Sequence, residues 1–335
     1  MCEANKDLTY DGGLRLLTRF VVAIFAVAVS LLNAGAGRGQ DYPNKPIRII
    51  TAGTGGTSDF TARLVAQGIS GPLGQQVVVD NRPSGVIPGQ VASQSPPDGY
   101  TLIVGSNSFW LVTFLRDNVP YDPVKDFSPI AEVARSPSFL AVHPSLPVKS
   151  VKDLIALAKA RPGQLNYASG TIGGADHLAA ELFKHMADVK IVRISYSSGS
   201  VRIASLISGE VQLIFGTGGT VAPYIKSGRL KALAVTSAKP FALAPELPTV
   251  AASGVPGYEA VQILGIWAPA KTPATIINRL NREIVQAIKR AEIKEKFLNS
   301  GVETIGNSPE QFASEIKSDM SKMGKMIKDV GIRDE

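Results

Sequence analysis

The chain has 335 residues, and its 35 Lys and Arg against 28 Asp and Glu give a formal net charge of +7. Hydrophobic residues make up 44% and charged residues 19%, a composition that fits a folded globular protein and excludes a disordered chain. The single cysteine, Cys2, excludes an internal disulfide and a zinc site built from thiolates, and three histidines are too few for a histidine-rich metal centre.

The N-terminal segment has the pattern of an export signal. Arg15 and Arg19 precede an apolar run from Phe20 to Leu32, which is shorter than the roughly 20 residues that a membrane-spanning helix needs. The small residues 34–36 then match an A-x-A cleavage site. We therefore predict that residues 1–36 are a signal peptide, and a membrane anchor stays open as the alternative.

Cysteine usage agrees with export. No cysteine follows the apolar run, so no lipid anchor is expected, and cleavage would remove Cys2. A protein without thiols suits an oxidising compartment, because nothing in it can mispair. These features predict a periplasmic protein.

The rest of the chain alternates short β-rich runs with helix-length amphipathic segments. The predicted strands are residues 47–52, 76–80, 100–104, 139–142, 165–168, 192–194, 211–215 and 232–235. The predicted helices among them are residues 58–69, 151–159 and 175–186. This alternation predicts an α/β fold with parallel sheets and crossover helices, in which the strand at 232–235 is the last of the series.

The C-terminal part is predicted to be mostly helical. Thr272 and Pro273 form an N-cap and N1 pair, which opens a helix that stops before Gly301. A capping box at residues 308–311 opens a final helix. The apolar face of that helix includes Met323, and methionine at such a position is typical of core packing.

Four of the predicted strands end in turns rich in glycine, serine and threonine. We call residues 53–59, 105–107, 169–176 and 216–220 the first, second, third and fourth glycine turn. Each leads towards a helix, whose N-terminus offers free N–H groups and the positive end of a dipole. One such turn alone is an ordinary tight turn, but recurrence at the carboxyl ends of parallel strands predicts a site for a small anion.

Several catalytic and cofactor motifs are absent from the sequence. It contains no G-x-G-x-x-G dinucleotide fingerprint, no Walker P-loop, no G-x-S-x-G elbow and no H-E-x-x-H pair. His177, Glu181 and His185 could share one helix face, so a metal site there is an alternative to two ordinary helix histidines. Basic residues form no block, which speaks against nucleic acid. We expect no cofactor and no metal.

A series of short blocks, in order from Tyr42 to the C-terminus, resembles the Bug receptors, the solute-binding proteins of tripartite tricarboxylate transporters. The blocks that carry the resemblance are Tyr42-Pro43-Asn44-Lys45-Pro46, Gly55-Gly56-Thr57-Ser58-Asp59, Asp80-Asn81-Arg82-Pro83, Pro97-Asp98-Gly99-Tyr100, Pro120-Tyr121-Asp122-Pro123, His143-Pro144-Ser145-Leu146-Pro147, His177-Leu178 and Leu247-Pro248-Thr249-Val250.

The resemblance implies a type II periplasmic binding protein, with two α/β domains around a ligand cleft and two crossing segments that join them. Domain 1 would comprise residues 41–138 and 265–335, and domain 2 residues 139–264. The crossings are expected near residues 136–142 and 262–267. Family members bind small carboxylates, and the resemblance therefore implies a small carboxylate ligand, membrane subunits of a tripartite transporter as partners, no enzymatic activity and a monomer.

The resemblance also implies which residues grip the carboxylate. Loops from both domains would hold it by backbone N–H groups, hydroxyls and bridging water, with Asp59 capping its helix. The expected ligand-binding residues are Gly55, Gly56, Thr57, Ser58, Asp59, Ser106, Ser169, Gly170, Thr171, Ile172, Gly173, Gly174, Gly216 and Thr217.

The chain departs from the family pattern at several positions. The family's aromatic residue and proline before the first Gly-Gly are replaced by residues 52–54, and its usual acid in the fourth turn is replaced by Gly216. These changes suggest a different ligand body, one without an amino group. A ligand-sensing module for a signalling partner and an exported hydrolase remain the alternative functions, although a hydrolase would need a nucleophile and base that no motif supplies.

Overall fold

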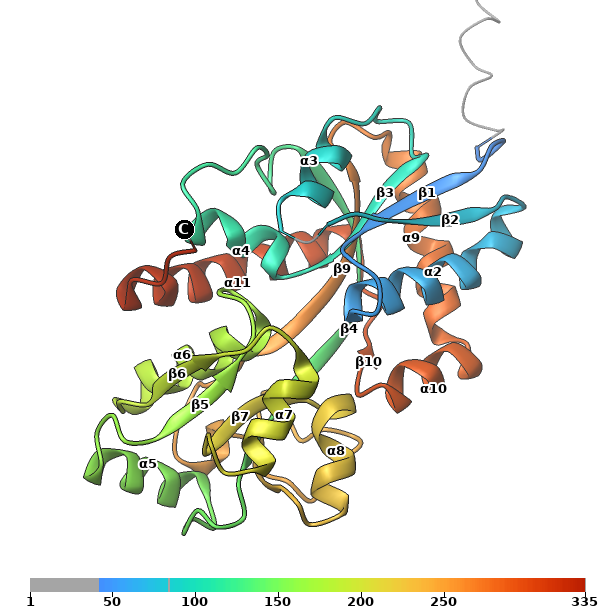
Figure 1. Ribbon diagram of the computed structural model, residues 1–335. Helices are drawn as coiled ribbons and strands as arrows, with labels where there is room; N and C mark the ends of the chain where they lie inside the picture. The colour runs from blue at the N-terminus through green and yellow to red at the C-terminus, as the bar shows by residue number, and fades with distance from the viewer. Residues whose placement is uncertain (1–41, 84, 335) are drawn as a thin grey trace, which may run out of the picture. The chain divides into compact units, whose positions relative to one another are not determined.

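A computed structural model describes residues 42–83 and 85–334 (Figure 1). The chain divides into two units, residues 1–44 and 45–335, and the first is described only at Tyr42 to Asn44. The predicted signal peptide, residues 1–36, lies outside the described residues. Within the described ranges, no helix combines the length and the apolar character that crossing a bilayer requires.

The first sheet of the larger unit gathers strands from both ends of the chain. Its order is β2, β1, β3, β9 and the first part of β4, with β10 on the other side of β4. The bounds are β1 Ile47–Thr51, β2 Val77–Asn81, β3 Thr101–Ser106, β4 Phe127–Val142, β9 Val261–Pro269 and β10 Glu303–Thr304. Its helices are α2 Thr57–Leu73, α3 Ile87–Ser93, α4 Ser108–Leu115, α9 Ala274–Lys289, α10 Ala291–Asn299 and α11 Pro309–Val330.

The second sheet is built around the last part of β4. Strands β7 and β8 flank it, and β5 and β6 continue the sheet beyond β7. The bounds are β5 Asn166–Ser169, β6 Val192–Ser195, β7 Leu213–Thr217 and β8 Lys231–Val235. Its helices are α5 Val151–Ala160, α6 Ala175–Ala187, α7 Gly199–Ile207 and α8 Gly218–Lys226, and a 3-10 turn covers Ala251–Ser253.

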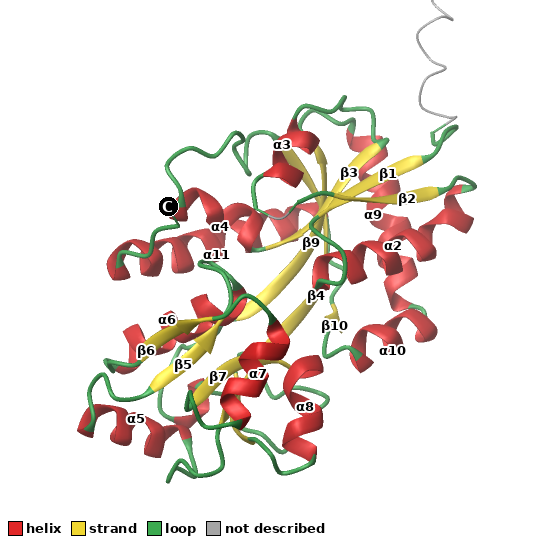
Figure 2. Ribbon diagram, viewed as in Figure 1, coloured by secondary structure: helices red, strands yellow, loops and turns green. Residues whose placement is uncertain are grey.

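Strand β4 belongs to both sheets and joins the two halves of this unit (Figure 2). It pairs with β9 from Phe127 to Pro137, and with β7 from Ser138 onwards. The change of partner therefore falls between these two adjacent residues.

The prediction of parallel sheets was wrong in part, because the sheets are mixed. The pairs β1/β2, β1/β3, β5/β6 and β5/β7 are parallel, as expected for crossover helices. Strands β9 and β4 instead run antiparallel to their main neighbours. Strand β4 leads from the first half into the second and β9 leads back, so the two are antiparallel to each other. Strand β9 also corrects the prediction that residues 232–235 end the series.

Two C-terminal details differ from the prediction. The long helix before Gly301 is broken into α9 and α10 at Arg290, whose backbone is extended. Pro273 is the N-cap of α9, and the Thr272 hydroxyl donates a hydrogen bond to the Pro269 carbonyl instead of capping the helix. The capping box that opens α11 at Ser308 is confirmed.

An aromatic cluster lies where the first sheet meets α4 and α11. The rings of Trp110, Trp267 and Phe312 contact one another, with centroids 5.0–6.3 Å apart. Gly265 on β9 leaves room for this packing, because an added Cβ would lie 2.1 Å from the Phe312 ring. Met323 is buried in the same core, so its predicted packing role is confirmed.

Candidate functional site

The glycine turns meet from opposite directions near the middle of β4. Strand β3 and the first part of β4 both run antiparallel to β9, so they point the same way, whereas β7 runs against β4. The end of β3 at Ser106 lies level with Ala134 of β4 through Leu264, and the end of β7 at Thr217 pairs with Ser138. Four residues of strand separate these levels, about 13 Å at the usual rise per residue.

The other two turns fall at the same edges. Strand β1 lies parallel beside β3, and β5 lies parallel beside β7. The carboxyl ends of parallel strands share one edge of a sheet. The first and second glycine turns therefore face the third and fourth across the point where β4 changes partners.

The first glycine turn presents open backbone at the N-terminus of α2. Gly55 and Gly56 are exposed, Gly55 has a φ of +84°, and an added Cβ at either glycine would meet no atom closer than 3.9 Å. Gly56 is the N-cap and has no side chain to bond the first amides, while Thr57 and Ser58 begin the helix. The first turn of α2 is thus left accessible to an anion.

Asp59, in the first turn of α2, stabilises the first glycine turn through hydrogen bonds. Its Oδ2 accepts a hydrogen bond from the Gly55 N–H at 3.0 Å, and its Oδ1 accepts one from Asn81 Nδ2 at 2.8 Å and lies 3.0 Å from Arg63 Nε. Burial would raise the pKa of Asp59, but the bonds from Gly55, Asn81 and Arg63 outweigh it and hold the pKa below 3.8. The carboxylate is buried, and both of its oxygens have partners within the protein, so it positions the turn instead of facing a ligand.

The second glycine turn is shorter than predicted. Gly105 and Ser106 are the end of β3, and Asn107 alone connects it to α4. The Ser106 and Ser108 hydroxyls lie 2.9 Å apart, and the Asn107 side chain donates to the Val261 carbonyl at 3.2 Å. Asn107 thereby ties the start of α4 to the start of β9.

All three glycine amides of the third turn already donate hydrogen bonds inside the protein. The N–H of Gly170 donates to Asp176 Oδ2 at 2.7 Å, that of Gly173 to His177 Nδ1 at 3.1 Å, and that of Gly174 to the Thr171 carbonyl at 3.1 Å. The expectation that Gly170, Gly173 and Gly174 contact a bound anion stays a prediction, and in this arrangement their amides are not free to donate to the anion. The amides of Thr171 and Ile172 and of the first turn of α6 are the ones left for it.

Two arginines that the sequence did not single out support the third turn. Arg193 donates to the Ser169 hydroxyl at 2.7 Å and to the Gly170 carbonyl at 2.6 Å. Arg202, on α7, forms an ion pair with Asp176. Both come from later elements of the second sheet, and nothing in the local sequence relates them to residues 169–176.

The third turn also touches the first half of the unit. Gly173 is buried, and a Cβ added to it would lie 2.3 Å from Cδ1 of Leu115 at the end of α4. Leu115 was not among the predicted residues, because an apolar side chain at a helix end looks like core. It brings the third turn into contact with the C-terminal end of α4.

The fourth turn is partly enclosed. Gly216 and Thr217 are the last residues of β7, and a Cβ on Gly216 would lie 2.5 Å from Val221. Gly219 lies close to the Ser300 carbonyl on the other half, 3.3 Å from where its Cβ would be. Packing against Val221 is therefore a reason for glycine at position 216 that does not involve a ligand.

The helices behind the four turns lack side-chain caps. Helices α2, α4, α6 and α8 have no side-chain hydrogen bond at their N-caps, which are Gly56, Asn107, Gly174 and Thr217. Helices α3, α9 and α10 also lack a side-chain cap, whereas serine hydroxyls cap α5, α7 and α11. The first amides of the four helices behind the turns are therefore left without a side-chain acceptor.

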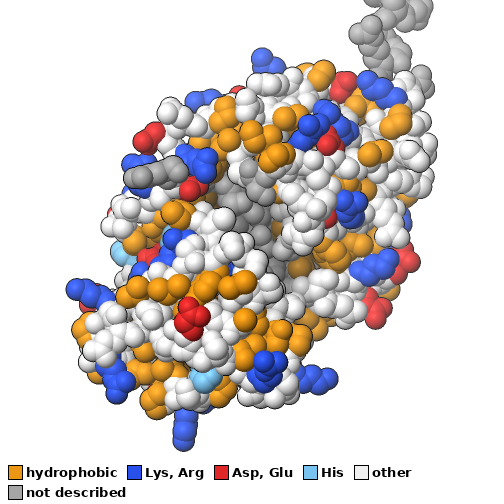
Figure 3. All heavy atoms as spheres, in the orientation of Figure 1, with side chains coloured by type: hydrophobic (Ala, Val, Ile, Leu, Met, Phe, Trp, Pro, Cys, Tyr) orange, Lys and Arg blue, Asp and Glu red, His pale blue; other side chains and the backbone are white. Residues whose placement is uncertain are grey.

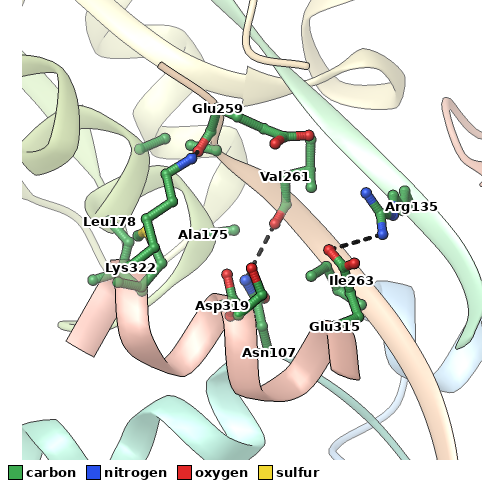
Figure 4. Close-up of a pocket in the computed structure, with 14 residues that line it drawn as sticks. Asn107, Arg135, Ala175, Leu178, Glu259, Val261, Ile263, Glu315, Asp319 and Lys322 are labelled. Carbon is green, nitrogen blue, oxygen red and sulfur yellow. Dashed lines mark hydrogen bonds and ion pairs between the residues drawn. The ribbon is translucent and has the colours of Figure 1, made fainter. Parts of the chain in front are cut away.

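A polar cavity of about 60 Å³ lies beside the meeting point of the turns (Figure 4). Asn107, the N-cap of α4, and Ala175, the first residue of α6, line it together with residues of α11 and the start of β9. At about 15 Å³ for each water centre, it has room for about four water molecules. Its charged lining residues are Arg135, Glu259, Glu315, Asp319 and Lys322.

Asp319 in this cavity is expected to make stability depend on pH. Burial raises its pKa from 3.8 to about 6, while the Trp110 indole donates to it at 2.8 Å. Ionisation of Asp319 is less favourable in the folded than in the unfolded protein. The free energy of unfolding therefore falls as pH rises from about 4 and reaches its lower level above pH 6. Asp319→Asn, which keeps an acceptor for Trp110, should raise the free energy of unfolding by roughly 1–3 kcal/mol at pH 7.5 and hardly at pH 4.

Urea unfolding of both proteins from pH 4 to 7.5 measures this difference. The exposed Asp117→Asn is the matched control and should show no such pH dependence. A difference between Asp319→Asn and the unchanged protein that stays constant across the range would contradict the raised pKa.

The described residues offer no group of three or more His, Cys, Asp or Glu that could hold a metal. His177 accepts from Gly173, and Glu181 is bound by the Tyr167 hydroxyl at 2.5 Å and by Lys184 at 2.7 Å. His185 is exposed, whereas His177 and Glu181 are buried. On the face drawn in Figure 3, Lys and Arg side chains are scattered and form no continuous block.

Comparison with known proteins agrees with this architecture. Residues 61–332 match the model of the "Tripartite tricarboxylate transporter family receptor". A protein from the tcbD-tcbE intergenic region of Pseudomonas sp. (strain P51) is 33% identical over 92% of this chain and 93% of its own length. Protein BugT of Bordetella pertussis is 31% identical over 93% of this chain and 98% of its own length.

Solved structures with the same fold include "R. palustris Rpa4515 with adipate", which is 34% identical with a TM-score of 0.76 over 88% of this chain and 99% of the other. The periplasmic binding protein BugD is 27% identical with a TM-score of 0.74 over 88% of this chain and 100% of the other. The chain therefore belongs to the tripartite tricarboxylate transporter receptor family, the Bug receptors, and is a solute-binding receptor with a periplasmic binding protein fold, not an enzyme.

Proposed function

We propose that this receptor captures a small organic anion through a carboxylate held between the first and third glycine turns. The observation that carries the proposal is the convergence of uncapped helix N-termini from both halves near the middle of β4. Such termini offer N–H groups and the positive end of a dipole, which suit an anion. Adipate in a receptor of 34% identity supports an aliphatic dicarboxylate as the ligand class.

Capture requires that the halves close on the ligand. We propose that residues 41–138 and 265–335 form one domain and residues 139–264 the other, and that the chain bends where β4 changes partners between Pro137 and Ser138. Closure excludes water, and the dipoles then act at a lower effective dielectric. The Leu115 and Gly173 contact is one place where the halves meet.

The wider role follows from the family. We propose that residues 1–36 direct export, that the receptor works as a monomer in the periplasm, and that it delivers its ligand to the membrane subunits of a tripartite transporter. Deleting the gene in its host should abolish uptake of labelled ligand, and restoring it should recover uptake. Unchanged uptake in the deletion strain, together with loss of its response to the ligand, would place the receptor in signalling instead.

A thermal-shift series tests the ligand class. Adipate at 100 times its Kd should stabilise the folded protein by about 2.7 kcal/mol, which raises the unfolding midpoint by about 4 °C. Adipamide has the same carbon skeleton without charge and should give no shift. Benzoate, acetate and citrate then separate aromatic, mono- and tricarboxylates. Equal shifts with adipate and adipamide, or no shift with any of these acids, would reject the carboxylate site.

A further inference from the structure

The first and third glycine turns are built on one local pattern. Each contains two adjacent glycines followed by a helix: Gly55-Gly56 before α2 and Gly173-Gly174 before α6. The first glycine of each pair has a positive φ, +84° and +74°. The second is the N-cap with an extended backbone, at ψ 169° and 157°.

The side chain at the third helical position completes the pattern in both turns. Asp59 Oδ2 accepts the Gly55 N–H at 3.0 Å, and His177 Nδ1 accepts the Gly173 N–H at 3.1 Å, each four residues along the chain. In an ordinary capping box, as at Ser308, the third helical side chain bonds the amide of the N-cap residue itself. In the glycine turns it bonds the amide one residue earlier, and the N-cap glycine has no side chain that could accept the first helix amides.

His177 can serve as this acceptor only in its neutral form. It is 4% exposed, and burial chiefly lowers its pKa to about 4, with Arg193 acting in the same direction and Glu181 and Asp176 against it. A neutral ring that accepts at Nδ1 carries its hydrogen at Nε2. That atom lies 3.9 Å from Glu181 Oε1, which the Tyr167 hydroxyl and Lys184 hold in place.

We propose that His177 is a positioning residue for anion capture, which holds Gly173 in its left-handed conformation and so keeps the first turn of α6 open, as Asp59 does for α2. The effect on anion capture rests on the proposed function, whereas the hydrogen bond from Gly173 to His177 does not. A neutral imidazole does this without adding a negative charge beside the anion. In the first half the charge of Asp59 is instead balanced by Arg63 at 3.0 Å.

Two substitutions of similar size separate this role from simple packing. In His177→Asn the side-chain oxygen lies near the place of Nδ1 and can accept from Gly173, whereas in His177→Gln the polar end lies near the place of Nε2. Both remove the ring and should lose similar stability. Only the asparagine should keep the Gly173 amide slow to exchange, at least tenfold slower than in the glutamine protein, and keep the adipate Kd within threefold. The glutamine protein should bind adipate at least tenfold more weakly.

Amide exchange and NMR shifts are measured without ligand, so they test the inference even if adipate does not bind. Nitrogen NMR of the unmodified protein should show His177 as the Nε2–H tautomer at pH 7, and this needs no variant to fold. A protonated Nδ1, or equal Gly173 exchange in the two variants, would overturn the proposal. The Gly173 amide could exchange more slowly in His177→Asn than in His177→Gln while the unmodified protein does not bind adipate. That result would keep the positioning role and reject the carboxylate ligand.

Discussion

Replacing Gly56 by Asp is expected to abolish anion binding while the fold stays intact. Gly56 has a φ of −85°, and its Cβ position is open, so an aspartate fits without strain. Aspartate is a preferred N-cap, and its carboxylate would take the amide of Ser58 or Asp59 that we assign to the ligand. We expect the affinity for adipate to fall at least 100-fold, which corresponds to about 2.7 kcal/mol, while stability without ligand changes by less than about 1 kcal/mol.

Gly56→Ala is the control for that experiment. Its methyl group fills the same open space but takes no amide, so adipate should still bind with less than about a tenfold loss. Calorimetry gives the affinities, and urea unfolding gives the stabilities. Unchanged adipate binding by Gly56→Asp would show that the first turn of α2 does not hold the anion. Gly173→Asp is less informative, because the positive φ and the contact with Leu115 would disturb the fold.

Replacing Arg135 by Met is expected to cause the largest loss of stability. Glu132 on β4 is fully buried, and its charge is balanced by Arg135, with Asn307 Nδ2 donating to it at 3.1 Å. Arg135 also lies 3.0 Å from Glu315. Removing one partner of a buried pair leaves an uncompensated charge, so the free energy of unfolding should fall by about 3–5 kcal/mol at pH 7.5.

The defect should shrink in acid. Burial already raises the pKa of Glu132, against the effect of Arg135, and loss of the guanidinium raises it further. A raised carboxyl pKa costs stability as pH rises, so the protonated form below about pH 4 should suffer least. Glu132→Gln combined with Arg135→Met should recover most of the loss. The exposed Arg333→Met, which breaks the pair with Asp117, should cost less than about 1 kcal/mol. A loss from Arg135→Met as small as this would mean that the pair is not buried in solution.

The sequence predicted the local elements better than their pairing. Strands with a helix after them, such as β1 and β5, were found because apolar runs end in glycine turns. Strand β9 was missed as a strand of the series, since its central residues are all buried and show no alternation. The break between α9 and α10 at Arg290 could not be predicted, because no glycine or proline lies beside it in the sequence. Tertiary packing places it, because Phe297 of α10 packs against Phe60 of α2 with ring centroids 5.7 Å apart.

The site shows a similar division. Glycine, serine and threonine at strand ends predicted where the turns lie, and the structure brings these turns together. Which amides remain for a ligand could not be read from the sequence, because Asp176 and His177 take the Gly170 and Gly173 amides through side-chain geometry. Arg193 and Leu115 were missed because they reach the turn from other elements.

The position of β9 in the first sheet has a consequence for the order in which the protein can fold on emerging from a ribosome or a translocation channel. Strand β3 pairs with β9 from Ile103 to Ser106, through residues as far along the chain as Trp267. Until that segment is released, β3 has an unpaired edge, and unpaired edges invite association with other chains. The nascent N-terminal half should therefore depend on holding factors, whereas the second sheet, whose paired residues all lie between Ser138 and Val235, can form earlier.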